Sequence, residues 1–153
     1  MELNEKMTPE LAMHYYARGL DCSQVVFGHC ARDVGVDETQ AVKIGGAFGG
    51  GMWRGDTCGC VTGALMALSA VYGHEADDPE AKKKLVEKVK EFERRWKAED
   101  ITNGTTICRD IIGFDFSQEG EFEKASKDGV MTRVCPQLAA TACRIVDEIL
   151  DEE

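Results

Sequence analysis

The chain has 153 residues, of which 43% are hydrophobic and 30% are charged, and its formal net charge is -10. This length and composition exclude general disorder, and we expect residues 1–153 to form a single domain with its own hydrophobic core. The acidic balance argues against nucleic acid as a partner, because like charges repel the phosphate backbone. We interpret the acidity mainly as a solubilising surface, which would also suit a basic redox partner.

Neither the first residues nor the longest apolar run predicts export or insertion into a membrane. Residues Met1 to Lys6 are polar and acidic and lack the apolar core of a signal peptide. The run from Cys60 to Tyr72 is too short to span a bilayer, and a threonine, a glycine and a serine interrupt it. We therefore expect a cytoplasmic protein that does not insert into membranes.

The amino-terminal half is expected to form helices, because capping residues and glycine stops punctuate its apolar spacing. The predicted bounds are Thr8 to about Gly19, Asp21 to about Val34, Asp37 to the glycine run at 45–51, and Asp56 or Thr57 to Gly73. The last of these helices is apolar nearly all round, which predicts a central position in the fold.

The carboxy-terminal half continues the same pattern. A long helix with a charged outer face begins at Asp78, with Leu85, Val89, Phe92 and Trp96 as its apolar stripe. A turn at Asn103–Gly104, a short helix from Thr106 to Ile112, a polar loop with one helical turn at 115–129, and a last helix from Cys135 to about Leu150 follow. The chain thus predicts an all-α, single-domain bundle of about six helices with a glycine-rich central connection.

Seven cysteines are the chemically informative residues: Cys22, Cys30, Cys58, Cys60, Cys108, Cys135 and Cys143. An odd number in a chain without a predicted export signal argues against a disulfide framework. Metal binding or thiol chemistry is the better default, with some of these cysteines serving as small core residues.

Four of the cysteines, namely Cys22, Cys58, Cys108 and Cys135, fall at predicted helix starts. A helix start offers unpaired N–H groups and a partial positive charge, which stabilise an anion beside them. A thiolate there has a pKa below the usual value of about 8.5, and the same N–H groups donate to the sulfurs of an anionic cluster. These positions therefore indicate either a reactive thiolate or ligands of an iron–sulfur centre.

The other three cysteines have weaker claims. Cys30 and Cys143 lie eight residues after Cys22 and Cys135, two helical turns away, and are expected in the core. Cys60 lies two residues after Cys58 and is held as a reserve ligand. No Cys-x-x-Cys pair occurs, so the spacing fits neither a zinc finger nor a thioredoxin motif. The three histidines, at 14, 29 and 74, are expected to be structural or exposed.

The stretch GGAFGGGMWRGD has two interpretations. It has no Gly-Lys pair followed by Ser or Thr and no preceding strand, so it is neither a phosphate loop nor a dinucleotide fingerprint. It is either a hinge between helices or a place where backbone approaches a cofactor. The glycines proposed for such an approach are Gly49, Gly50, Gly51 and Gly59, and the following Trp53 and Arg54 belong to the rim of the site or to an interface.

The segment CGCVTG at 58–63 resembles the C-G-A-x-x-G element of the C-GCAxxG-C-C family of small proteins. The other three family cysteines correspond to Cys22 in DCSQVV, Cys108 in ICRDIIG and Cys135 in VCPQLA. The resemblance extends from about the first helix to the last, and departs at Cys60, where the family pattern has alanine. It implies redox activity. A similar domain in split-Soret cytochromes is associated with an iron–sulfur centre, but this chain lacks their haem-attachment motif.

Three functions follow as hypotheses. The first is an iron–sulfur protein that transfers electrons to a redox partner protein, with Cys22, Cys58, Cys108 and Cys135 as ligands and Cys60 in reserve. Oxygen would strip such a cluster during purification in air, and a homodimer would follow if two chains supply ligands. The second is a metal-free thiol–disulfide or sulfur-handling oxidoreductase in which one of the same cysteines attacks the substrate, and Cys58 is the preferred candidate. The third is a structural zinc-binding helical protein.

Overall fold

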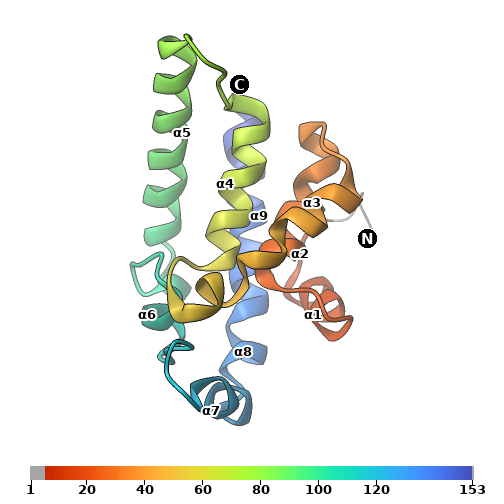
Figure 1. The fold of residues 1–153 in the computed structure, drawn as a ribbon, viewed down its shortest axis with the longest axis vertical. Coiled ribbons are helices and arrows are strands. Elements are labelled where there is room, and N and C mark those ends of the chain that lie inside the picture. The colour runs from red at the N-terminus through yellow and green to blue at the C-terminus, as the bar shows by residue number, and fades with distance from the viewer. Residues whose placement is uncertain (1–5, 153) are drawn as a thin grey trace.

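Helices α4 and α9 run through the middle of the molecule, with α5 on one side and α1 to α3 on the other (Figure 1). The computed structural model describes residues 6–152. Its helices are α1 (Pro9–Ala17), α2 (Cys22–Cys30), α3 (Glu38–Ile44), α4 (Gly59–Tyr72), α5 (Pro79–Lys97), α6 (Cys108–Ile112), α7 (Glu121–Asp128), α8 (Val130–Arg133) and α9 (Cys135–Asp151). Across these residues the sole β-type pairing is an isolated antiparallel bridge between Thr57 and Ile107. The predicted all-α fold is confirmed.

The helices begin at the residues whose side chains cap them. Thr8 accepts a hydrogen bond from the Leu11 N–H, Asp37 from Gln40 and Asp78 from Ala81, which satisfies N–H groups that the helix itself leaves unpaired. At the other ends, Gly35 and Gly113 adopt the left-handed conformation that stops a helix. The predicted starts of α1, α3 and α5 are confirmed to the residue.

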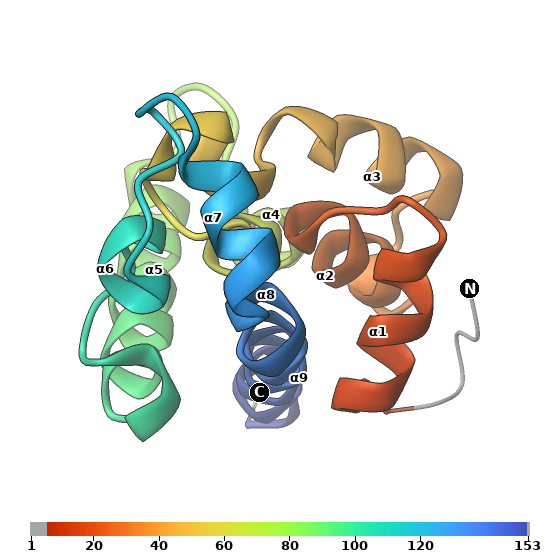
Figure 2. The ribbon, with the colours of Figure 1, turned by 90° about the horizontal axis from the view of Figure 1, so that it is seen from below.

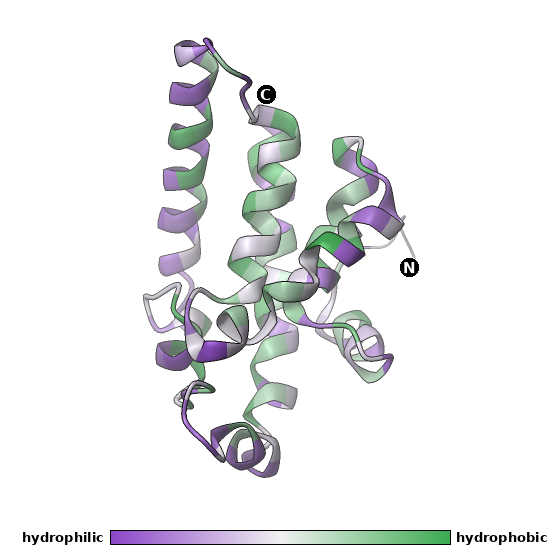
Figure 3. Ribbon diagram, viewed as in Figure 1, coloured by the Kyte–Doolittle hydropathy of each residue, from purple (hydrophilic) through white to green (hydrophobic). Residues whose placement is uncertain are grey.

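The core lies where α4 packs against α2, α5 and α9. The central position predicted for α4 is confirmed, since Val61, Ala64, Ala67 and Leu68 are fully buried. From α5, only the inner stripe enters the core; Trp96 stacks near Phe92 and its indole N–H donates to the Thr105 carbonyl at 2.9 Å. Figure 3 shows the contrast between the charged outer face of α5 and the mostly apolar α4.

Three predictions about the helices were wrong. Helix α4 begins at Gly59 rather than at Asp56 or Thr57, and α6 begins at Cys108 rather than at Thr106. The reason is an antiparallel bridge between Thr57 and Ile107, flanked by backbone hydrogen bonds that join Cys58 to Thr106 and Cys108 to Asp56. The segment 115–129, predicted as a polar loop with one helical turn, contains helix α7, and the short helix α8 follows directly after it. They were missed because each buries a single residue, Ala125 and Val130 respectively, and so leaves almost no apolar pattern.

Helices α2 and α4 approach each other closely where both begin. A Cβ added to Gly59 would stand 3.0 Å from the Cys22 Cβ, and one added to Gly63 would stand 2.9 Å from the Ser23 carbonyl oxygen. Real Cβ contacts are rarely so short, so glycine is what permits this crossing. The crossing places the first residue of α2 beside the start of α4. Among residues 6–152, no helix is both long enough and apolar enough to cross a membrane.

Candidate functional site

The four cysteines predicted at helix starts are all found there. Cys22, Cys108 and Cys135 are the first residues of α2, α6 and α9, and Cys58 is the residue before α4. Seen from below, the starts of these helices gather around one end of α9 (Figure 2). The fold therefore brings together four residues that are up to 113 positions apart in the sequence.

Two of these cysteines are joined through their backbones. The Cys58 N–H donates to the Thr106 carbonyl at 2.8 Å, and the Cys108 N–H donates to the Asp56 carbonyl at 2.6 Å. The Arg109 guanidinium adds a hydrogen bond to the Asp56 carboxylate at 3.1 Å. This pairing fixes the start of α6 against the start of α4, and with it the two cysteines.

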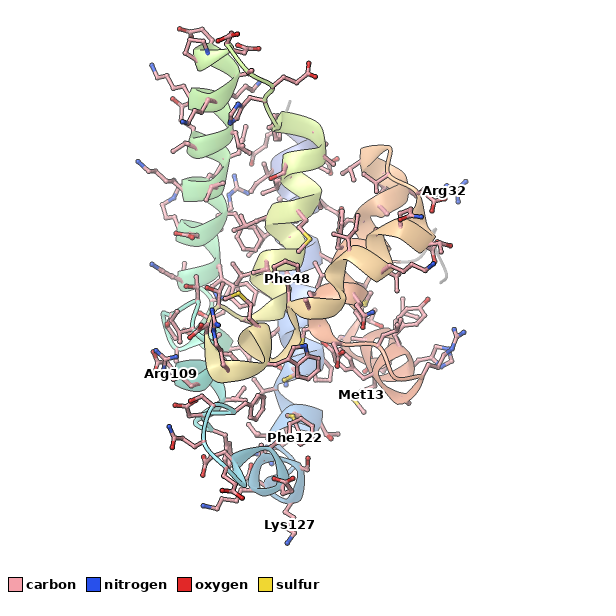
Figure 4. All side chains as sticks on the ribbon, in the orientation of Figure 1. Met13, Arg32, Phe48, Arg109, Phe122 and Lys127 are labelled. Carbon is pink, nitrogen blue, oxygen red and sulfur yellow. The ribbon has the colours of Figure 1, made fainter. Side chains whose placement is uncertain are left out.

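A cavity of about 240 Å³ lies between the four cysteines. Cys22, Cys58, Cys108 and Cys135 all line it. Most of the remaining wall is apolar: Met13, Ile111, Phe116, Phe122, Met131 and Leu138. Figure 4 shows Met13 of α1 and Phe122 of α7 at this end of the molecule. A group held in this cavity would be bounded mainly by sulfur and hydrocarbon.

Cys22 is the hydrogen-bonded centre of the sulfur cluster. Its sulfur accepts from the thiols of Cys135 and Cys60, and the Tyr16 hydroxyl lies 3.5 Å away and also donates to it. These donors, first that of Cys135, lower the pKa of Cys22 well below its usual value, although burial opposes them. Cys22 is therefore the cysteine best prepared to carry a negative charge.

The neighbouring thiols are held in the protonated form. Because Cys60 and Cys135 each donate to Cys22, that hydrogen bond is the first cause that raises their pKa values. Burial is the first cause that raises the pKa of Cys108. In the absence of any bound group, these opposite shifts mean that Cys22 loses its proton before Cys60, Cys108 and Cys135 do.

Cys60 belongs to the sulfur cluster although it does not line the cavity. It is fully buried, and its thiol hydrogen-bonds to Cys58 as well as to Cys22. The contact with Cys58 is possible because Cys58 precedes α4 and has a ψ of 134°, so its side chain does not follow the helical direction. The predicted core positions of Cys30 and Cys143 are confirmed, since both are buried away from the cavity.

Tyr16 is a site residue that the sequence did not predict. Its hydroxyl is shared between the Cys22 sulfur at 3.5 Å and the Cys135 carbonyl oxygen at 3.3 Å, so it links the starts of α2 and α9. Burial, followed by the nearby sulfurs, raises its pKa well above the usual value, and the hydroxyl stays protonated as a donor. The sequence offers only a weak signal for this role: Tyr16 lies in the last turn of α1, the helix that precedes the helix of Cys22.

The four glycines proposed for the site divide into two groups. Gly50 and Gly59 line the cavity. Gly49 and Gly51 do not, and serve packing instead: an added Cβ would stand 2.7 Å from the Asp21 Cβ and 2.4 Å from the Asp56 nitrogen respectively. The glycine run is thus partly a wall of the cavity and partly a tight turn beside it.

The residues after the glycines form a strained segment at the cavity mouth. Met52 and Trp53 both have positive φ, at 58° and 60°, a conformation that side chains rarely adopt. Trp53 lines the cavity while 47% of its surface stays exposed, which agrees with the predicted rim position. Arg54 turns outward and pairs with the Asp56 carboxylate at 2.6 Å.

All seven cysteines are free thiols. Within the part of the chain that the structure describes, no group of three or more His, Cys, Asp or Glu side chains has the arrangement of a metal-ion site. None of the three histidines lines the cavity. The cavity is lined by four thiols, with the oxygen-bearing side chains of Tyr16, Asp21 and Thr132 also in its wall.

Fold and site together define a small all-α protein whose cavity is built from cysteines at helix starts. More particularly, the chain belongs to the family described as "Putative redox-active protein (C_GCAxxG_C_C)", whose model matches residues 20–149. The family resemblance inferred from the cysteine motifs is confirmed. Comparisons with curated proteins and with solved structures found no match. Tyr16 lies outside the matched residues.

Proposed function

We propose that this protein binds an iron–sulfur cluster through Cys22, Cys58, Cys108 and Cys135 and transfers electrons. The observation that carries the proposal is that these four cysteines, from four different helix starts, line one cavity. Membership of a family described as redox-active also supports a redox function. Four thiolates are the usual ligand set of such clusters, which supply one-electron chemistry when bound.

The surroundings of the cysteines fit a buried anionic group. Apolar side chains such as Phe116 and Met131 form much of the cavity wall, and the polarity around a cluster is one of the factors that set its potential. Tyr16 and Cys60 bring additional O–H and S–H donors to the sulfur of Cys22. These donors would stabilise the charge of the ligand set. The acidic surface, with a net charge of -10, would suit a basic protein as electron partner.

The first test is an anaerobic purification followed by a visible spectrum and analysis of iron and acid-labile sulfide. Broad visible absorption with iron and sulfide in a simple ratio is the expected result. A protein that is colourless and free of metal, and stays so after attempted cluster reconstitution, would overturn the proposal.

A second candidate function is thiol–disulfide exchange, which the lowered pKa of Cys22 favours. The sequence had suggested Cys58 as the attacking residue, whereas the hydrogen-bond donors surround Cys22. The Cys22 thiolate would attack a substrate disulfide and release one thiol. The thiol of Cys135 or Cys60 would lose its proton and attack the mixed disulfide, which releases the second substrate thiol and leaves an internal disulfide.

Tyr16→Phe tests the charge state that this second function requires. Removing the hydroxyl deletes one donor to Cys22, so the pKa of Cys22 should rise and its alkylation at neutral pH should slow severalfold. The measurement is the pH profile of iodoacetamide labelling at Cys22 in metal-free protein, read by mass spectrometry. Tyr15→Phe is the matched control, because Tyr15 does not line the cavity. An unchanged profile in Tyr16→Phe would mean that the hydroxyl does not act on Cys22.

A further inference from the structure

A second pair of thiols lies between α2 and α9, away from the cavity. Cys30 ends α2, and the thiol of Cys143 on α9 hydrogen-bonds to it. Both are almost completely buried, with 3% and 2% of their surfaces exposed. Neither lines the cavity or contributes to the function proposed above.

The spacing of the two cysteine pairs shows how α2 and α9 are oriented relative to each other. Eight residues separate Cys22 from Cys30, and eight separate Cys135 from Cys143, which is about 12 Å along each helix. Cys22 is hydrogen-bonded to Cys135, as Cys30 is to Cys143. Two contacts at equal spacing require that the helices run in the same direction and in matching register.

One residue of the second pair lies in the wall of a surface cavity, although only 2% of its own surface is exposed. Cys143 lines a surface cavity of about 780 Å³, bordered by Met7 and by the carboxylates Asp33, Asp147, Glu148 and Asp151, with Lys6 and Arg144 as its cations. The excess of carboxylates repels anionic reagents such as glutathione disulfide. A small neutral oxidant is not repelled.

We propose that Cys30 and Cys143 form a second redox site, which hydrogen peroxide oxidises to a disulfide that links α2 to α9. The Cys143 sulfur attacks the O–O bond, and a sulfenic acid and one water result. The Cys30 sulfur then attacks the sulfenic sulfur, the S–S bond forms, and hydroxide leaves and takes up the proton of Cys30 as the second water. Two thiols lose two electrons and two protons, and one peroxide becomes two waters.

The surroundings of Cys143 make this reaction slow. Its hydrogen bond to Cys30, followed by burial, raises its pKa, so little thiolate is present at neutral pH. The pair therefore responds to sustained exposure to peroxide. The resulting S–S bond is about 2.05 Å long and forms between two side chains that are already in hydrogen-bond contact.

The experiment is disulfide mapping of the full chain after prolonged exposure to excess hydrogen peroxide. Trypsin is unsuitable, because Cys22 and Cys30 share one peptide and Cys135 and Cys143 share another. Chymotrypsin cleaves after Phe27 and after Leu138 and separates all four. Free thiols are blocked with N-ethylmaleimide in denaturant before digestion.

The expected result is a reductant-sensitive link between the peptides of Cys30 and Cys143, absent in Cys143→Ala and in Cys30→Ala. Blocked thiols at both positions, oxidation to acids without a link, or a link from either cysteine to another partner would overturn the proposal. The outcome does not depend on the iron–sulfur proposal, because all four proposed ligands lie outside this pair. Thermal melts of the reduced variants check that each still folds.

Discussion

Cys22→Ser is expected to abolish cluster binding in anaerobically prepared protein while the helical fold persists. Cys22 lines the cavity and is the one sulfur that accepts hydrogen bonds from Cys60, Cys135 and Tyr16. A serine oxygen is a poor substitute for a thiolate toward iron. We expect iron and sulfide per chain to fall by more than about tenfold, since even changes to residues around the ligands cost 10–100-fold in affinity. The measurement is metal analysis beside far-ultraviolet circular dichroism.

Cys60→Ala is the matched control for this prediction. Cys60 is more deeply buried than Cys22 and hydrogen-bonds to Cys22 and Cys58, but it does not line the cavity, and the family motif has alanine there. The variant should therefore retain its iron. Loss of iron in Cys60→Ala to the level of Cys22→Ser would show that the fifth cysteine is a ligand. Retention of iron in Cys22→Ser would remove that residue from the ligand set.

The helices could be predicted from the sequence because their ends carry local signals. Asp78 followed by Pro79 marks the start of α5 through contacts within one turn, and the αL conformation of Gly113 marks the end of α6. The start of α4 could not be predicted in the same way. Thr57 is held extended by pairing with Ile107, which lies 50 residues later, and no local pattern encodes such a partner.

The four cysteines of the site could be predicted for the same local reason, since each lies at a helix start. The sequence could not predict which of the four cysteines carries the negative charge. That depends on donors that only the fold supplies, such as the hydroxyl of Tyr16, which reaches Cys22 after α1 turns back against α9. The packing roles of Gly49 and Gly51 could not be predicted from the sequence either, because the atoms that leave no room for a Cβ belong to Asp21 and Asp56.

Gly59→Ala is expected to disturb both the fold and the site. The added Cβ would stand 3.0 Å from the Cys22 Cβ, the Phe48 carbonyl oxygen and the Ser23 nitrogen, two of which are rigid backbone atoms. The φ of Gly59 is outside the left-handed region, so the cost arises from contact and not from backbone strain. Overpacking of this kind costs about 1–3 kcal/mol. The better helix propensity of alanine, about 1 kcal/mol, offsets part of that.

The same substitution should move Cys22, because α2 can relieve the contact only by shifting its first turn away from α4. We therefore expect a lower melting temperature together with lower iron content. Gly46→Ala is the control: its Cβ would meet only the Gln24 Nε2, at an ordinary 3.6 Å, and neither quantity should change. If Gly59→Ala has the melting temperature and the iron content of the wild type, then α2 and α4 can adjust at their crossing more easily than the contacts of Gly59 indicate. A lower melting temperature with unchanged iron would instead separate the stability of this crossing from the geometry of the cysteines.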